Sequence, residues 1–183
     1  MRKVASFVRI ARPDEYARVG ALTVAAYRTL AVDHLWGGHD AEILDVASRA
    51  ERDDVLVAVV GTDVVGAVTY VSDESSPWLE WTQPGEAQFR LLAVDPQALS
   101  RGGGEALARA CIDRARTQGR SLIIHTTHWM TAAQRLYDRL GFVRREDRDV
   151  AYKVWYRPGT ELPREWVGES FLAYRWSAEK SSP

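Results

Sequence analysis

Three consecutive glycines follow an apolar run and an Asp-Pro turn in residues 89–107, which read FRLLAVDPQALSRGGGEAL. This order predicts a strand that ends at Val94, a turn with few side chains, and a helix whose first turn carries Glu105. The first turn of a helix has unpaired N–H groups and the positive end of the helix dipole, and glycine lets a ligand approach the main chain closely. The segment therefore predicts a cradle for a phosphate or pyrophosphate group.

Two familiar phosphate-binding loops do not fit this segment. A dinucleotide-binding fingerprint that starts at Gly102 needs Gly or Ala at the position of Leu107, and the Gly-Lys-Ser/Thr sequence of a P-loop does not follow. Taken alone, the glycines are also compatible with an ordinary strand-to-helix loop. We therefore expect the guest to be neither NAD nor a nucleoside triphosphate held in the usual way.

A second motif, AAQRLYDRLGF at residues 132–142, follows the glycines after one predicted helix and one predicted strand. Together the two segments resemble the GNAT acyltransferase superfamily, in which a strand and Asp-Pro precede Gln/Arg-x-x-Gly-x-Gly/Ala, and a later helix carries Ala-x-x-Leu-Tyr before x-x-Leu-Gly-Phe. The second pattern is matched by Ala133, Leu136, Tyr137, Leu140, Gly141 and Phe142. The resemblance covers residues 7–143 in the order of the elements.

The resemblance implies acetyl-CoA as the co-substrate. The usual loop length puts Gly102 and Gly104 on the family's Gly-x-Gly, which is the register we prefer, and Leu99 then occupies its Gln/Arg position. Alternatively, Arg101-x-x-Gly104-x-Ala106 satisfies the pattern two residues later, and Met130 stands where the family often has an Asn. The residues implied to bind the cofactor are Leu92, Ala93, Val94, Arg101, Gly102, Gly103, Gly104, Glu105, Ala106 and Ala133.

Acyl transfer to an amine requires a group that accepts a proton. An amine with a pKa near 10.4 is neutral in only about one of 2,500 molecules at pH 7, so its deprotonation is roughly 4.6 kcal/mol uphill. Glu86 is the candidate base, directly or through a water, because it immediately precedes the cradle strand and resembles an acidic residue that many family members place there. His125 and His128 are its competitors. Their His-x-x-His spacing lacks clustered third ligands, so we expect no metal site.

The departing CoA thiolate needs a proton donor, and its basicity is close to the ~8.5 of a thiol. The resemblance implies that Tyr137 hydrogen-bonds the sulfur and supplies this proton. The alternative for Tyr137 is a core aromatic residue whose hydroxyl finds a backbone partner.

Aromatic and histidine side chains on two predicted loops are candidates to bind the acceptor. His34 and Trp36 lie on the loop over residues 31–39, and Trp78 and Trp81 lie on the long loop over residues 72–87. Indole faces suit an amine or an amphipathic substrate. We therefore predict His34, Trp36 and Trp81 as acceptor-binding residues.

Hydrophobic periodicity predicts the elements that position these residues. Helices are predicted over residues 14–30, through 43–46, from 105 to 119, and over 131–141 with a capping box formed by Thr131 and Gln134; strands are predicted at 7–10, 55–60, 64–71, 89–94, 121–126, 142–143, 150–156 and 170–176. Two strands paired as a hairpin, followed by strands that are connected through helices, indicate an α+β or mixed α/β fold. With the resemblance, we expect a mostly antiparallel sheet of six to seven strands, flanked by about four helices and splayed at the acetyl-CoA site.

Composition narrows the class of protein. The 183 residues predict a single domain over 1–176 with a frayed tail at 177–183, and 24 Lys plus Arg against 25 Asp plus Glu give no electrostatic signal for nucleic acid. No segment approaches the ~20 apolar residues of a membrane span. The lone Cys111 lies in an apolar helical stripe and indicates a reduced core thiol, so we expect a cytoplasmic protein.

Residues 144–149 alternate arginines with acidic residues, which predicts a solvated turn.

The leading hypothesis is an N-acetyltransferase that moves an acetyl group directly from acetyl-CoA to a small-molecule or peptide amine in a ternary complex. Leu99 and Met130 favour an alternative, in which a catalytically silent module of the same fold binds CoA as a ligand or sensor. A third class, a dimerisation domain, is suggested by the late strand over residues 170–175, which can pair between the chains of a homodimer.

Overall fold

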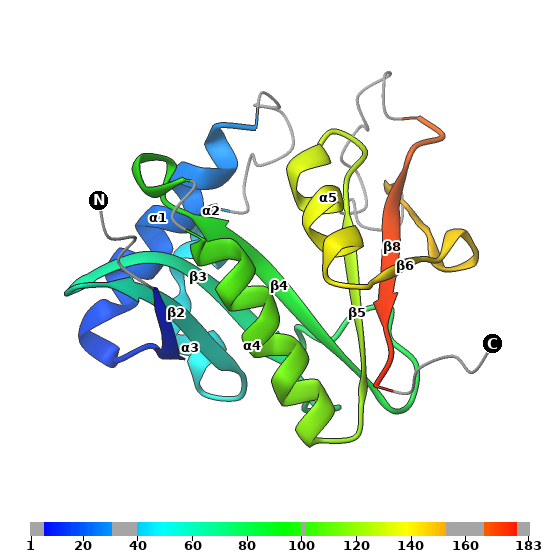
Figure 1. Cartoon of the computed structure of the whole chain (residues 1–183), viewed down its shortest axis with the longest axis horizontal. Helices are drawn as coiled ribbons and strands as arrows, with labels where there is room; N and C mark the ends of the chain where they lie inside the picture. Colours follow the sequence, from blue (N-terminus) through cyan, green and yellow to red (C-terminus); the bar gives the residue numbers. More distant parts are fainter. Residues whose placement is uncertain (1–5, 31–39, 100–101, 153–166, 179–183) are drawn as a thin grey trace.

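The computed structural model describes residues 6–30, 40–99, 102–152 and 167–178. They form one mixed sheet with helices on both faces (Figure 1). The strands are β1 (Phe7–Ile10), β2 (Asp54–Val60), β3 (Asp63–Val71), β4 (Glu86–Val94), β5 (Ser121–Thr126), β6 (Val143–Arg144), β7 (Val150–Ala151) and β8 (Ser170–Trp176). The helices are α1 (Tyr16–Arg28), α2 (Asp40–Leu44), α3 (Val46–Ala50), α4 (Gly103–Thr117) and α5 (Thr131–Arg139). Short 3-10 turns lie at Pro13–Glu15, Pro96–Ala98 and Glu146–Arg148.

The strand order is β1-β2-β3-β4-β5-β8-β6, and β7 also pairs with β8. Every pair in this order is antiparallel except β4 with β5, which run parallel and are joined through α4. A parallel pair requires such a crossover, whereas β2 and β3 are joined by a hairpin turn in which Gly61 has a φ of 64°. The expected class, a mostly antiparallel mixed sheet, is confirmed.

The alternation of side chains along the strands divides the core between the two faces of the sheet. Val55, Val57 and Val59 of β2 pack in a cluster with α1 and α3, whereas Leu56 and Ala58 pack in a second cluster with α4 and α5. Because successive residues of a strand point to opposite faces, β2 can read as a continuous apolar run and still serve both layers. Cys111 is fully buried in the second cluster.

Three details differ from the sequence-based expectations. Eight strands and five α-helices are found among the described residues, because β6 and β7 are separate two-residue strands and because Asp45 caps α3 and divides it from α2. The predicted capping box at Thr131 is wrong: α5 begins after Met130, and the Gln134 amide instead donates to the main-chain oxygens of Thr127 (2.9 Å) and His128 (3.1 Å).

The late strand expected to pair between chains is β8, which lies between β5 and β6 of its own chain. The part of the predicted strand at 153–156 lies outside the described residues. None of the helices in the described ranges is both long and apolar enough to cross a bilayer.

A buried carboxylate ties the edge strand β1 to the start of α1. Both Glu15 oxygens accept from the Arg9 guanidinium (2.6 and 2.7 Å), and one also accepts from the Arg12 N–H (2.8 Å), although the Glu15 side chain is only 8% exposed. The Arg9 hydrogen bond is the main reason why the pKa of Glu15 is lowered to about 2, against the opposing effect of burial.

We predict that Glu15→Gln lowers the free energy of unfolding at pH 7 by about 1–3 kcal/mol, the cost of disrupting a buried charged hydrogen-bond set. The folded pKa of Glu15 lies below its ordinary value, so its contribution is present above about pH 4.5 and is lost as the pH falls toward about 2. Urea unfolding at pH 7 and pH 2.5, with the exposed Glu51→Gln as control, measures this difference. An equal loss of unfolding free energy in Glu15→Gln at both pH values would contradict this prediction.

Candidate active site

The site lies where β4 and β5 separate. The two strands pair at only three positions, Glu86 with Ser121, Ala87 with Leu122 and Gln88 with Ile123, and then diverge, as Figure 1 shows. We call the region beyond Gln88 the fork. Within the fork, the side of β4 that faces β5 has no strand partner among the described residues, so its main-chain N–H and C=O groups are available to a ligand.

A β-bulge shapes the β4 arm of the fork. Thr69 of β3 pairs with Arg90 and Ala67 pairs with Ala93, so β4 carries one extra residue between these pairs. The bulge is accompanied by a φ of 54° at Leu91, a left-handed conformation that is rare for a residue with a side chain. Such strain is found at functional sites, where the surrounding structure holds it in place.

A cavity of about 420 Å³ occupies the fork. Its walls come from β4 (Gln88–Leu92), from β5 and the turn that follows (Ile124–Thr127), and from α5. On the other face of the sheet, the long loop after β3 contributes Trp78 and Trp81, and β8 contributes Phe171. Four of the predicted site residues line this cavity, namely Trp81, Leu92, Ala133 and Tyr137, and Met130 lines it as well.

The glycine segment begins α4 next to the end of β4. Gly102 is exposed in a left-handed conformation (φ 80°), and a methyl group added there would meet no atom within 4 Å. Gly103 is buried against Ala58 and Val65, and Gly104 is half-buried with Val94 Cγ2 3.3 Å from the position of an added Cβ. The main chain at Gly102 is therefore open to a ligand, whereas Gly103 serves the packing of the helix on the sheet.

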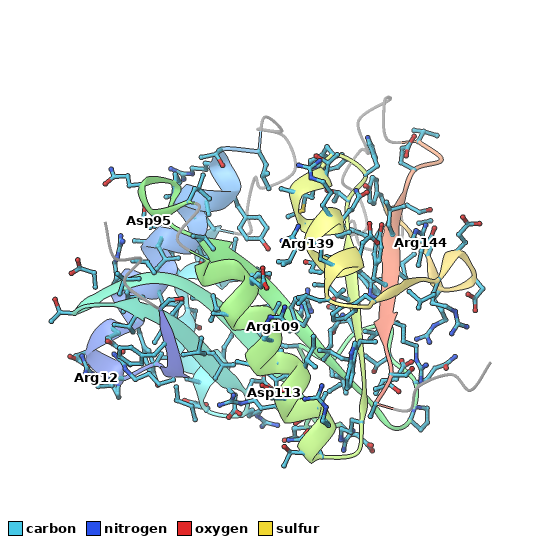
Figure 2. The ribbon with its side chains drawn as sticks, viewed as in Figure 1. Arg12, Asp95, Arg109, Asp113, Arg139 and Arg144 are labelled. Atoms are coloured by element: carbon cyan, nitrogen blue, oxygen red, sulfur yellow. The ribbon has the colours of Figure 1, made fainter. Side chains whose placement is uncertain are left out.

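The remaining cradle residues surround this helix start. Ala106 donates its N–H to the Gly102 carbonyl (3.0 Å), and Glu105 pairs with Arg109 of α4 (2.8 Å) and Arg139 of α5 (3.7 Å), two arginines that Figure 2 labels. The Arg109 hydrogen bond lowers the pKa of Glu105. Ala93 and Val94 pair with β3 and do not line the cavity. Arg101 lies outside the described residues.

Tyr137 projects from α5 into the cavity wall. Its ring is 2% exposed and packs against Phe89, Phe142 and Tyr174 with centroid distances of 5.6–5.9 Å. The hydroxyl makes no hydrogen bond within the described part of the chain, so no backbone partner holds it there. Burial raises the pKa of Tyr137 well above its ordinary value, so the hydroxyl is protonated at neutral pH and remains a donor.

Glu86 lies at the closed end of the fork and does not line the cavity. Its side chain is 3% exposed and accepts hydrogen bonds from Arg148 (3.0 and 3.1 Å), Arg175 (3.0 Å) and the Gln83 N–H (2.9 Å). Burial alone would raise its pKa, but these hydrogen bonds outweigh burial and lower it. Glu86 is thus ionised with both oxygens engaged, which favours a structural role over the predicted role of proton acceptor.

His125, the competitor of Glu86, does line the cavity. Its Nε2 lies 3.2 Å from the main-chain oxygen of Arg148, whereas Nδ1 is buried and makes no hydrogen bond with any residue that the structure describes. Burial lowers the pKa of His125 to about 4, so the ring is neutral at pH 7. His128 is exposed, lies 3.4 Å from Glu169, and is not part of the cavity wall.

The side of the cavity that carries His125 has an aromatic wall. Trp81 adopts a φ of 57°, meets His125 edge to face at 5.2 Å and stacks on Phe171 at 5.6 Å. Trp78 lies within 5.6 Å of both the Arg49 and Arg90 guanidinium groups, and Arg90 also pairs with Glu80 (2.8 Å). The predicted acceptor residue Trp81 therefore lies at the site, whereas His34 and Trp36 lie outside the described residues.

Sequence reasoning missed one residue of this site in particular. Arg148 was expected in a solvated turn, but its side chain is only 12% exposed and reaches Glu86 and Trp81, so that expectation is wrong for Arg148. Its neighbours Arg145 and Asp147 do form an exposed pair, as expected. Nothing in the local sequence distinguishes Arg148 from them, because its partners lie more than sixty residues earlier in the chain.

Among the described residues, no three His, Cys, Asp or Glu side chains gather as a metal site would require. The fold and the site together define an α/β protein in which two parallel strands separate. A helix that begins at glycines lies beside them, and a cavity lies between the two strands.

The family model described as the acetyltransferase (GNAT) family matches residues 24–142, and the chain belongs to this family. A search of curated proteins found no match.

Solved structures of similar fold agree with this assignment. The chain is similar to yncA of Salmonella typhimurium, solved with its cofactor acetyl-CoA (18% identity, TM-score 0.64, covering 97% of this chain and 96% of that one). It is also similar to an N-acetyltransferase of Staphylococcus aureus Mu50 (17%, TM-score 0.68, covering 95% and 99%). A third similar structure is the ribosomal-protein-S18-alanine N-acetyltransferase of Escherichia coli (17%, TM-score 0.66, covering 97% and 96%).

The environment of His125 predicts an unusual titration. We expect the ring to remain neutral down to a midpoint near pH 4, because burial opposes the charged form. A histidine titration followed by NMR, with the signals assigned by their loss in His125→Asn, measures the midpoint. A midpoint for His125 at the ordinary value near 6.5 would contradict this prediction.

Proposed function

We propose that this protein is an acetyl-CoA-dependent N-acetyltransferase that moves the acetyl group directly to an amine within a ternary complex. The observation that carries the proposal is the single cavity in the fork, which contains a proton donor and a proton acceptor. Tyr137 belongs to the α4–α5 layer, whereas His125 alternates with the core residue Ile124 and so lies on the opposite face of the sheet. The donor and the acceptor therefore approach the fork from opposite faces.

The open main chain at Gly102 and the first turn of α4 suit the pyrophosphate of acetyl-CoA. Backbone N–H groups and the helix dipole supply the attraction, and no side chain at Gly102 obstructs it. The unpaired side of β4 in the fork, with Leu92 in the cavity wall, suits the amide groups of the pantetheine arm, which can pair there like an added strand. The two segments meet because β4 ends beside Gly104.

His125 is the group that we propose to accept the amine proton. A base with a pKa of about 4 cannot remove a proton from an ammonium group of pKa near 10.4, because the transfer is roughly 9 kcal/mol uphill. This cost exceeds the roughly 4.6 kcal/mol needed to lose the same proton to solvent at pH 7. The amine must therefore be neutral before it attacks, and His125 accepts a hydrogen bond from it and takes the proton as the C–N bond forms.

Tyr137 is the group that we propose to donate a hydrogen bond to the sulfur of the leaving group. Its hydroxyl is protonated at neutral pH and is not committed to an acceptor among the described residues, so this hydrogen bond can stabilise the negative charge on the sulfur as the C–S bond breaks. The aromatic wall formed by Trp78, Trp81 and Phe171 is suited to the body of the acceptor. A silent CoA-binding module remains the second candidate, because Leu99 is 62% exposed and supplies no polar group to the cradle.

We predict that Gly102 contributes to acetyl-CoA binding in addition to its effect on stability. Gly102→Ala and Gly61→Ala both place a side chain at positive φ and should each cost about 1–2 kcal/mol of stability. Only Gly102→Ala should weaken acetyl-CoA binding, by about tenfold, because its methyl group displaces the phosphate from roughly one main-chain hydrogen bond. Calorimetric titration measures both affinities, and equal affinities in the two variants would contradict the proposed cradle.

The activity itself is tested by free-thiol release from acetyl-CoA in the presence of a panel of primary amines. We expect amine-dependent release, and we expect Tyr137→Phe to lower kcat by about 100-fold or more without changing the Kd of acetyl-CoA. Tyr174→Phe is the matched control, since Tyr174 packs on Tyr137 but does not line the cavity. Saturable binding without amine-dependent release would favour the silent module, and an unchanged kcat in Tyr137→Phe would remove Tyr137 from the mechanism.

A further inference from the structure

Arg148 connects the closed end of the fork to the residues that face the acceptor. Its guanidinium donates from Nη1 to Glu86 Oε1 (3.1 Å) and from Nη2 to Glu86 Oε2 (3.0 Å), which is the bidentate geometry of a strong arginine–carboxylate pair. The same Nη2 donates to the main-chain oxygen of Trp81 (3.0 Å). The main-chain oxygen of Arg148 lies 3.2 Å from His125 Nε2.

The contact with His125 fixes the tautomer of the neutral ring. A carbonyl oxygen can only accept a hydrogen bond, so Nε2 must carry the ring proton and donate a hydrogen bond to the main-chain oxygen of Arg148. Nδ1 then carries the lone pair of the ring, and it is buried without a hydrogen-bond partner among the described residues. A buried acceptor without a partner is destabilising, so this tautomer persists only because the contact of Nε2 with Arg148 holds it.

The contact with Trp81 holds a strained backbone in place. Trp81 has a φ of 57°, a left-handed conformation that is unfavourable for a residue with a side chain. The hydrogen bond from Arg148 to its carbonyl and the contacts of its ring with His125 and Phe171 oppose that cost. Arg148 thus contacts both Trp81 and His125, and those two residues contact each other.

Glu86 is in turn anchored independently of Arg148. Arg175 of β8 donates from Nε to Glu86 Oε1 (3.0 Å) and from Nη2 to the Ser121 hydroxyl of β5 (2.6 Å). The carboxylate therefore has a position set by β4, β5 and β8 before Arg148 binds to it.

We propose that Glu86 and Arg148 are positioning residues, which hold His125 as its Nε2–H tautomer and Trp81 beside it, so that Nδ1 is the ring atom left to accept a proton. This inference rests on the proposed function. It assigns to Glu86 an indirect role, in which the carboxylate acts through Arg148 and touches neither substrate.

The test compares the His125 ring in four ¹⁵N-histidine-labelled full-length proteins: wild type, Glu86→Gln, Arg148→Lys and Arg144→Lys. Arg144, which Figure 2 labels, forms an equivalent bidentate pair with Asp149 and has no recorded contact with His125 or Trp81, so Arg144→Lys is the matched control. NMR at pH 7 gives the tautomer and the exchange rate of the Nε2 proton with solvent. Thiol-release kinetics give kcat and the KM of acetyl-CoA for the same proteins.

We expect the Nε2–H tautomer in the wild type and in Arg144→Lys. In Glu86→Gln and in Arg148→Lys, the Nε2 proton should exchange about 5–10-fold faster, the effect of losing about one hydrogen bond, with a mixed tautomer. In these two variants kcat should fall by about tenfold or more while the KM of acetyl-CoA stays within about twofold. If one of the two variants fails to fold, the other decides the outcome.

Unchanged tautomer and exchange in the folded variants would overturn the inference, and so would an equal change in Arg144→Lys. The kinetic arm separates this inference from the proposed function. If wild-type protein acetylates no amine, the proposed function fails, and the NMR comparison still decides whether Glu86 and Arg148 position His125.

Discussion

The limited pairing of β4 with β5 is the constraint on which the rest of the site depends. The two parallel strands share only three paired positions and then separate, which leaves one side of β4 without a strand partner among the described residues. Main-chain N–H and C=O groups in a protein interior require partners, so an open fork is stable only where water or a ligand can reach it. The cavity of about 420 Å³ lies at this point, and the glycine-started helix α4 follows directly from the β4 arm.

The closed end of the fork is held by one carboxylate and two guanidinium groups. A buried ion pair is weak evidence for net stability, because the cost of removing charges from water can exceed the attraction between them. The value of Glu86, Arg148 and Arg175 lies in geometry: together they join β4, β5 and β8 at the point from which the strands diverge. The same set reaches His125 and Trp81 through Arg148, so one cluster contacts both the closed end of the fork and the aromatic wall of the cavity.

Local signals made much of this fold predictable from sequence. The hairpin at Gly61, the β4 strand, the glycine-started helix and the Tyr137 helix each depend on residues close together in the chain, and each was found near its predicted position. The role of Arg148 was not predictable, because an arginine among acidic residues looks the same whether its partner is water or a carboxylate 62 residues away. Trp81 and Leu91 adopt left-handed backbone conformations that no residue-type preference indicates. The capping box predicted at Thr131 does not form, because the Gln134 side chain donates hydrogen bonds to the main chain of the preceding turn instead.

A crystal structure of the protein with acetyl-CoA would show whether the fork holds the thioester between Tyr137 and the acceptor, as we propose. We expect the pyrophosphate at the first turn of α4, the pantetheine arm along the unpaired side of β4, and the sulfur within hydrogen-bond distance of the Tyr137 hydroxyl. A structure in which acetyl-CoA binds elsewhere, or in which the sulfur lies beyond the reach of Tyr137, would contradict it.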